Sequence, residues 1–254
     1  MADLRYCTDY HATYESFEVH CPHCGVFNVV PRSAAPTACN LIALRKAVCI
    51  SCQETFGING DLVSPPYAFL LDDAASFLRK RRYMNVVLNS AQAFEAFCSL
   101  YLVVELAYKP FWRESSRPMV QKLNEVLNLL STQTERYTFA PMRSIVLHLL
   151  LDGVKPASLT EAKTVIGQLD VLGKKAISVE EVEALRDPVL RELLRRMRAA
   201  NVDRLRNRVV HKEAYRPTHD EASQCLESAR STLLPLGEHL GLVTDEPNWY
   251  RSTA

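Results

Sequence analysis

A short basic segment near the carboxyl end of the chain contains the residue types that cut RNA without a metal ion. It reads Arg206, Asn207, Arg208, two valines and His211. Arg206 can give two parallel hydrogen bonds to phosphate oxygens, and His211 supplies an imidazole, the side chain that exchanges protons near neutral pH. Asn207 is four residues before His211, so the two share a helix face. The spacing predicts that Arg206 holds a phosphate, that Asn207 orients the ring or touches the phosphate, and that His211 is general base or acid.

Such a site would use the 2′-hydroxyl of the RNA as the nucleophile against the adjacent phosphorus, which requires a base, an acid and positive charge on the phosphoryl oxygens. The alternative interpretation is structural, because an arginine and a histidine near a helix end also satisfy backbone carbonyls or the helix dipole. Glu95, on an earlier predicted helix, lies beside an apolar stripe. It either reaches the motif or forms an ordinary surface ion pair.

The overall charge excludes a general attraction of the chain to nucleic acid, because 30 basic residues stand against 29 acidic ones in 254. Positive charge is nevertheless concentrated in residues 186–216, where ten cationic side chains stand against four acidic ones. This segment is either a local phosphate-attracting surface or a solvated helix face. A second basic cluster, Arg79 to Arg82, falls at the carboxyl end of another predicted helix.

Two Cys-x-x-Cys pairs near the amino end predict a metal site. Cys21 and Cys24 form the first pair and Cys49 and Cys52 the second, with 24 residues between the pairs. Four thiolates suit tetrahedral Zn²⁺, and a closed site of this kind is structural because it has no open position for water. Accidental pairs or a redox dithiol are the alternatives, and three nearby residues could substitute as ligands: His20, His23 and Cys39.

Alternating or β-branched residues flank both pairs, which predicts short strands, and Cys-Pro-His-Cys-Gly resembles the knuckle of a zinc ribbon. A segment this short with few large apolar side chains needs a metal to fold. We therefore expect a ribbon over residues 1–62 that binds RNA, DNA, a protein or its own helical domain.

The chain becomes helical after Pro65 and Pro66. We expect helices over about 66–82 and 83–108, several shorter helices in 109–187, a long helix over about 188–213, and a last helix from a capping box at Thr218 to about Leu240. The apolar stripe of the 83–108 helix comprises Val87, Ala91, Phe94, Cys98, Tyr101, Leu102 and Glu105. The predicted fold is thus mainly α, with a helical body over residues 66–240, a tail over 241–254 and the β ribbon in front.

The motif and the helix order resemble the HEPN superfamily, all-helical proteins with an Arg-x4–6-His motif that include many metal-independent endoribonucleases. The match covers both ends of the body, whereas residues 112–185 look like an inserted segment. Lys212 stands where the family often has Gly after the His, so the local turn departs from the pattern.

The resemblance implies cleavage to 2′,3′-cyclic phosphate and 5′-hydroxyl ends, and a homodimer that brings two motifs into one cleft. It also implies a toxin or antiviral effector, restrained by an antitoxin or regulatory protein. Many HEPN-like domains are non-catalytic, so an adaptor that binds nucleic acid or protein through the ribbon is the alternative.

The amino-terminal residues do not form a secretory signal, since no apolar core follows a basic end. The most apolar runs, residues 100–107 and 144–151, are shorter than the roughly 20 residues of a membrane span. We therefore expect a cytoplasmic protein with no membrane partner.

Overall fold

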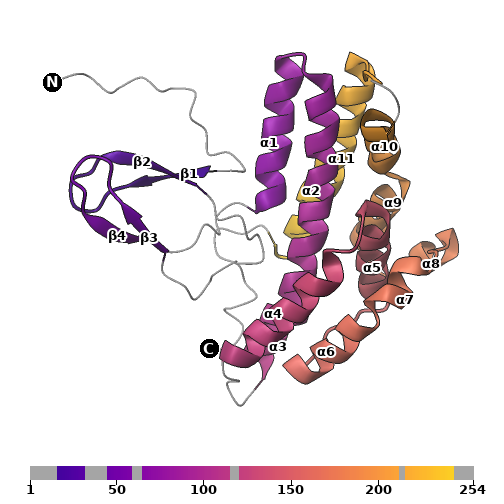
Figure 1. The fold of residues 1–254 in the computed structure, drawn as a ribbon. Helices are drawn as coiled ribbons and strands as arrows, with labels where there is room; N and C mark the ends of the chain where they lie inside the picture. The colour runs from indigo at the N-terminus through magenta and orange to yellow at the C-terminus, as the bar shows by residue number, and fades with distance from the viewer. Residues whose placement is uncertain (1–15, 32–44, 59–64, 115–119, 212–214, 243–254) are drawn as a thin grey trace.

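The computed structural model describes residues 16–31, 45–58, 65–114, 120–211 and 215–242. They form a body of packed helices with a small β region at the amino end (Figure 1). The predicted fold class, mainly α with a small cysteine-bearing β region, is confirmed. Of the predicted tail, Gly241 and Leu242 are the described residues.

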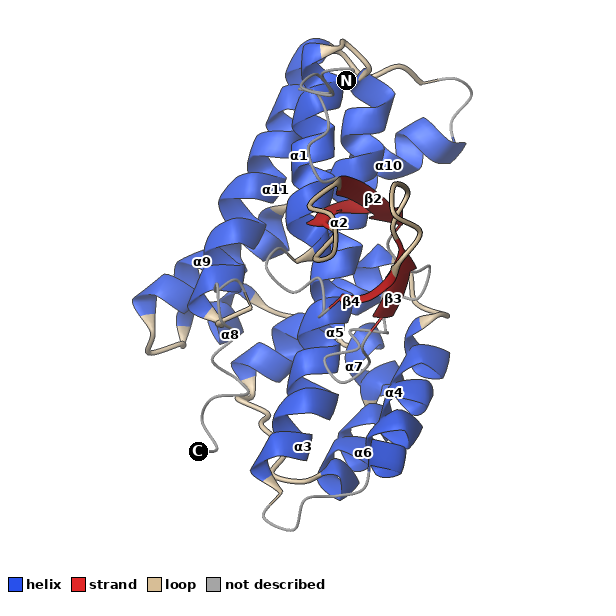
Figure 2. Cartoon of the chain, turned by 90° about the vertical axis from the view of Figure 1, so that its left-hand side faces the viewer, coloured by secondary structure: helices blue, strands red, loops and turns tan. Residues whose placement is uncertain are grey.

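The β region consists of two antiparallel pairs of strands within the described residues (Figure 2). β1 (Ser16–His20) pairs with β2 (Phe27–Pro31), and β3 (Arg45–Val48) pairs with β4 (Thr55–Ile58). Each pair closes at a knuckle, because His20 faces Phe27 just outside the first cysteine pair and Val48 faces Thr55 just outside the second. The strands lie where the flanking residues predict them.

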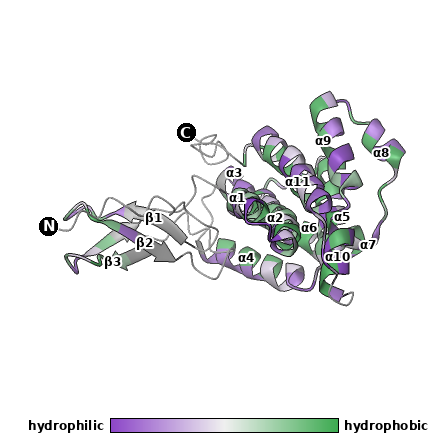
Figure 3. Ribbon diagram, turned by 90° about the horizontal axis from the view of Figure 1, so that it is seen from above, coloured by the Kyte–Doolittle hydropathy of each residue, from purple (hydrophilic) through white to green (hydrophobic). Residues whose placement is uncertain are grey.

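The centre of the body is α2 (Tyr83–Val103), which packs against α1 (Pro66–Arg79) before it and several later helices around it (Figure 3). It continues through a π-helical turn, η1 (Val104–Tyr108), into α3 (Lys109–Arg113). The predicted apolar stripe is buried at every position. Glu105 is buried with it and forms an ion pair with Lys109.

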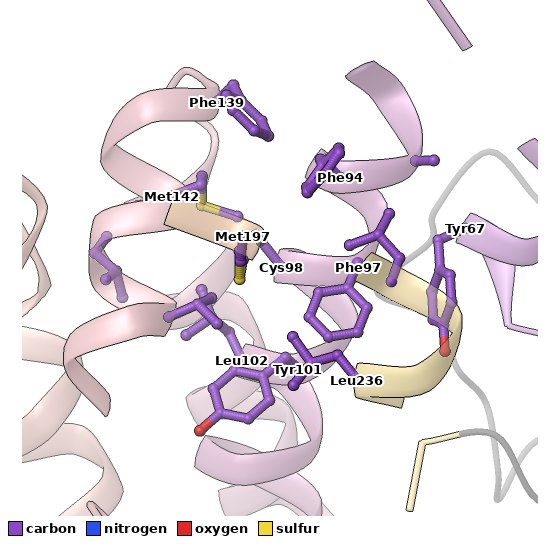
Figure 4. Packing of buried hydrophobic residues seen from close by; sticks show 14 of the residues in the cluster. Tyr67, Phe94, Phe97, Cys98, Tyr101, Leu102, Phe139, Met142, Met197 and Leu236 are labelled. Carbon is purple, nitrogen blue, oxygen red and sulfur yellow. The ribbon is translucent and has the colours of Figure 1, made fainter. Parts of the chain in front are cut away.

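The middle of the chain forms α4 (Val120–Thr134), α5 (Phe139–Leu151), α6 (Leu159–Gly167), α7 (Leu169–Lys174) and α8 (Val179–Glu183). These helices share one apolar core with α1 and α2. Figure 4 shows the part of this core to which Phe139 and Met142 of α5 belong. Ser178 caps α8 with a complete capping box, in which its hydroxyl accepts from the amide of Glu181. The segment that the resemblance predicts to be an insertion therefore contributes to the body's core.

The predicted long helix over about 188–213 is wrong as a single element, since it is divided into α9 (Pro188–Ala199) and α10 (Val202–His211). Ala200 has an extended ψ of 118° that ends α9. Its carbonyl accepts a hydrogen bond of 2.9 Å from Arg143 of α5, and Asp203 lies 3.8 Å from the same guanidinium. Arg143 thus stabilises the break and fixes the start of α10. Residues 212 and 213 of the predicted helix lie outside the described residues.

The last helix, α11 (His219–His239), begins at the predicted capping box, with Thr218 accepting from the amide of Glu221. It packs along α1 and α2. Among the described residues, the continuous helix over Tyr83–Phe111 is the one long and apolar enough to cross a membrane. Because 61% of its most apolar window is buried inside the body, it matches the core helix of a globular protein.

Candidate functional site

The four paired cysteines come together in one cluster. Their sulfur atoms all lie within 4.8 Å of one another, with 3.7 Å between Cys21 and Cys52 and 3.5 Å between Cys24 and Cys49. A tetrahedral Zn²⁺ with Zn–S bonds of about 2.3 Å would separate its sulfurs by about 3.8 Å. The close contacts run between the two pairs, and all four cysteines are free thiols. This donor set fits a bound metal ion.

The two knuckles have the same backbone geometry. In each one, the backbone amide of the first cysteine donates a hydrogen bond to the carbonyl five residues later, at 2.9 Å to Val26 and 3.0 Å to Glu54. The residue after the second cysteine donates back to the carbonyl of the first, at 2.8 Å from Gly25 and 3.1 Å from Gln53. Both returning residues have a positive φ, 72° for Gly25 and 60° for Gln53. The first knuckle therefore uses glycine where the backbone is left-handed, and the second does not.

Backbone amides prepare one cysteine of the cluster for ionisation. Hydrogen bonding from the amide of Cys52, and then from that of Ser51, lowers the pKa of Cys49 to about 6. The amide of Glu54 lowers the pKa of Cys52, but burial and the neighbouring thiols outweigh it and raise that pKa to about 12. Four close sulfurs cannot all ionise against one another, so four thiolates require a cation among them.

Asn28 links the two knuckles, a role that the sequence did not reveal. Its side chain is buried; its amide nitrogen donates at 2.8 Å to the carbonyl of Val26 and lies 3.7 Å from the sulfur of Cys49. Its oxygen accepts from the amide of Ile50 at 2.9 Å. The available signal was a single amide side chain inside an otherwise apolar strand. A buried polar group in such a place needs partners, and the opposite knuckle supplies them.

The alternative ligands are not part of this cluster among the described residues. His20 is exposed, places a ring nitrogen 3.3 Å from the carbonyl of Gly25, and packs edge-on against Phe27. His23 is exposed, and its amide donates to the sulfur of Cys21 at 3.4 Å. Cys39 lies outside the described residues.

The motif residues lie on the outer part of α10, where Asn207 and His211 are exposed and Arg206 is half-buried. Val202 and Val209 are buried, and Arg206 lies on their side of the helix. Asn207 and His211 lie on the other side. Arg206 donates a hydrogen bond of 3.2 Å to the side-chain oxygen of Asn207. The structure thus joins the predicted phosphate-binding arginine to Asn207 and leaves His211 open to solvent.

Glu95 of α2 lies within electrostatic reach of the motif. Burial raises the pKa of this carboxyl above its ordinary range, and the positive charge of Arg206 opposes that rise. This proximity follows from the packing of α10 against α2. The charge of Arg206 thus acts on Glu95, which fits both interpretations, a residue that reaches the motif and an ordinary ion pair.

Most of the other arginines in residues 186–216 are bonded within the chain. Arg195 and Arg196 pair with acidic residues of α8 and α9 at 2.8 Å and 3.0 Å, and Arg191 and Arg198 donate to backbone carbonyls. Arg208 pairs with Glu221 at 3.2 Å and stacks over Tyr215. These side chains stabilise the body, so the excess of positive charge in this segment overstates the charge that a ligand can use.

Comparison of the chain with protein-family models, with curated proteins and with solved structures found no match. The resemblance to HEPN domains therefore depends on the motif residues and the order of the helices.

Proposed function

We propose that the protein is a metal-independent endoribonuclease of the HEPN type, with Arg206, Asn207 and His211 as its catalytic residues. The observation that carries the proposal is the contrast between two neighbouring arginines. Arg208 is held by Glu221 and Tyr215, whereas the hydrogen bond of Arg206 within the described residues goes to Asn207, on the face that bears His211. Arg208 is thus used within the body, whereas Asn207, which accepts from Arg206, shares its exposed helix face with His211.

The chemistry follows from these side chains. His211 removes the proton of the substrate's 2′-hydroxyl, whose oxygen attacks the adjacent phosphorus while the bond to the 5′-oxygen breaks. Arg206 stabilises the non-bridging oxygens, and a second acid protonates the departing 5′-oxygen. The products are a 2′,3′-cyclic phosphate and a 5′-hydroxyl.

The second acid comes, in this proposal, from another copy of the chain. One exposed histidine cannot easily be base and acid on opposite sides of one phosphorus, and a two-fold dimer would add a second His211. The apolar stripe of α2 is buried within its own chain, so it cannot form the dimer contact. Among the described residues, Val210 in the motif segment and Met84 at the start of α2 are large apolar side chains that are 47% and 39% exposed, so they could contribute to such a contact.

We assign Zn²⁺ to the four-cysteine site, where it would hold the ribbon together without taking part in cleavage, because four sulfur ligands would complete its tetrahedral coordination and leave no position for water. The ribbon would recognise the RNA or a protein partner. In this proposal the enzyme is a cytoplasmic toxin or antiviral effector, which an antitoxin or regulatory protein keeps inactive.

Cleavage of total RNA in EDTA, followed by analysis of the new ends, tests the proposal. Arg206→Ala and His211→Ala should each lower the rate by about 10²–10⁴-fold. Arg204→Ala is the matched control, since Arg204 is exposed on the same helix and should leave the rate unchanged. Activity that needs added magnesium or manganese and survives both motif substitutions would contradict the mechanism.

The dimer is tested separately by light scattering together with an activity titration. Specific activity should fall as the protein dissociates on dilution, because each site would lose its second histidine. Constant specific activity in the monomer would show that His211 finds its partner within its own chain.

A non-catalytic adaptor is the second candidate, and one observation favours it. The ribbon exposes Phe27, Val48 and Ile50, the last two at 57% and 70%. Exposed apolar groups beside a rigid knuckle suit a protein contact. A protein that keeps its metal and fold, cuts no RNA, and loses its partner when Ile50 is changed to Ser would be an adaptor.

A further inference from the structure

The turn between α1 and α2 presents four consecutive cations, Arg79, Lys80, Arg81 and Arg82. All four are exposed, and no hydrogen bond or ion pair joins their side chains to any other residue that the structure describes. The arginines of α9 differ in this respect, because they are bonded to carboxylates and carbonyls. Exposed cations without partners keep their full charge for an external anion.

Arg81 occupies a backbone position that favours glycine. Its φ is 56°, and it sits in a helix-terminating turn in which the amide of Arg82 donates to Phe77 at 2.9 Å and that of Arg81 donates to Leu78 at 3.0 Å. Glycine is the usual residue at this point because it has no Cβ to clash. The chain places a guanidinium there against the preference of the backbone. Unfavourable conformations of this kind often accompany function.

The turn lies at the end of the body toward which α10 runs (Figure 1). The ring of Tyr83, directly after the cations, meets the ring of His219 at the start of α11 with 5.7 Å between centroids. This contact holds the start of α11 against the turn, and Arg208 of α10 pairs with Glu221 in the first turn of α11 at 3.2 Å. The carboxyl end of α10, where His211 lies, is therefore at the same end of the body as the four cations.

We propose that the α1–α2 turn, Arg79 to Arg82, binds the phosphate backbone of single-stranded RNA and leads it to the Arg206–His211 motif. The identity of the ligand as RNA rests on the proposed function. RNA is favoured over other polyanions because the same end of the body carries the groups that would act on a phosphodiester. The binding itself does not require cleavage, so the two proposals can fail separately.

Binding is measured by fluorescence anisotropy with a short labelled oligouridine, in the His211→Ala protein so that the probe stays intact. The test variant replaces all four cations of the turn with Gln. The matched control replaces Lys122, Lys155, Lys174 and Arg186 with Gln, because these are also exposed cations without a partner among the described residues. Both variants lose the same charge, so a difference in RNA affinity between them shows that the position of the cations matters.

The turn variant should bind at least roughly tenfold more weakly. The slope of log affinity against log salt should become shallower by about 0.7 for each phosphate that the variant no longer neutralises. The control should match the parent. Equal binding by the two variants would overturn the proposal, even if Arg206 and His211 prove catalytic. Weaker binding by the turn variant, together with no RNA cleavage by the protein that keeps His211, would support the surface and reject the nuclease.

Arg81→Gly is a sharper single variant, because it removes one cation and relieves the backbone. It should raise the Tm by about 2–4 °C while weakening RNA binding. A higher Tm with unchanged binding would exclude Arg81 from the surface. Vesicles containing phosphatidylserine test the other polyanion: turn-dependent binding to vesicles without binding to RNA would overturn the proposal.

Discussion

Different interactions stabilise the ribbon and the helical body. The buried core of the ribbon consists of Cys21, Cys49 and Phe56 among the described residues. The body has a continuous core, in which rings such as Tyr67 and Phe97 pack edge-on with centroids 5.1 Å apart (Figure 4). Apolar burial stabilises the body, whereas the ribbon has too little of it and must rely on its cysteine cluster.

The two regions also position their polar groups differently. In the ribbon two of the four clustered cysteines, Cys21 and Cys49, belong to the buried core, so the fold and the site cannot be separated. In the body the motif lies outside the core, on a helix fixed by Val202 and Val209. Changes to the motif should therefore leave the body folded, while changes to the cysteines should unfold the ribbon.

Metal removal should have the largest effect and should act on the ribbon alone. Structural zinc contributes about 10–16 kcal/mol to small zinc-binding modules. The Cys49→Ser, Cys52→Ser variant should lose its metal and become sensitive to proteolysis before residue 65, while helical circular dichroism persists. Metal analysis, limited proteolysis and circular dichroism measure these outcomes.

Cys225→Ala is the matched control for this change, because Cys225 is buried in the body. It should keep the metal and destabilise the helices instead. Metal content that survives the double substitution would show that the four cysteines are not the ligands.

The next effect concerns a charge inside the body's core. Glu105 and Lys109 form an ion pair whose side chains are 6% and 18% exposed. Lys109→Ala would leave the carboxylate buried without its partner, which costs about 3–5 kcal/mol. Lys163→Ala breaks the surface pair with Glu125 at 2.9 Å and should cost at most about 1 kcal/mol. Urea unfolding compares the two, and equal losses would contradict the difference in burial.

The sequence predicted the parts of this molecule that depend on local spacing. The cysteine pairs, the strands beside them and the capping boxes at Ser178 and Thr218 all involve residues close together in the chain. The apolar stripe of α2 was predictable for the same reason, because apolar residues at three- and four-residue steps indicate one buried helix face. These features defined the metal site and the order of the helices.

What the sequence did not predict depends on contacts between distant residues. The break between α9 and α10 is stabilised by Arg143, 57 residues before Ala200. The roles of Asn28 and Arg208 likewise depend on partners that only the fold brings near. The orientation of the motif was unpredictable because it follows from this break.

A smaller effect on stability is expected at Glu95, a half-buried carboxyl of the helical body that lies near the motif. Burial raises the pKa of this carboxyl above its ordinary value of 4.5, against the opposing charge of Arg206. The contribution of Glu95 to the free energy of unfolding is therefore fully present below pH 4.5. It falls as pH rises through the raised pKa, because the folded protein must then ionise a buried group. Glu95→Gln removes this fall.

The Tm of Glu95→Gln relative to the parent should thus be higher at neutral pH than at pH 4. We also expect RNA cleavage to drop by roughly tenfold or more, because Arg206 loses the nearby negative charge of Glu95. Glu227→Gln, an exposed residue of α11, is the control for both measurements. A Tm difference that does not change with pH would argue against the buried carboxyl, and unchanged cleavage would remove its positioning role.

The smallest predicted effect returns to the ribbon and compares its two knuckles. Gly25 and Gln53 occupy equivalent left-handed positions, with φ of 72° and 60°. A residue with a Cβ costs about 1 kcal/mol more than glycine in this conformation. Gln53→Gly should therefore stabilise the second knuckle, and Gly25→Ala should destabilise the first by a similar amount. Among the described residues, no atom other than those of Gly25 and its chain neighbours lies within 4 Å of a Cβ added there, so the backbone conformation alone would cause the loss.

Because folding of the ribbon is coupled to metal binding, these changes should appear as metal affinity. A change of about 1 kcal/mol corresponds to roughly a fivefold change in the apparent dissociation constant. Competition with a chromogenic chelator should thus show tighter zinc binding for Gln53→Gly and weaker binding for Gly25→Ala, in opposite directions around the parent. Equal affinities in all three proteins would mean that the ribbon folds independently of its metal, and the contrast between the two regions would then be wrong.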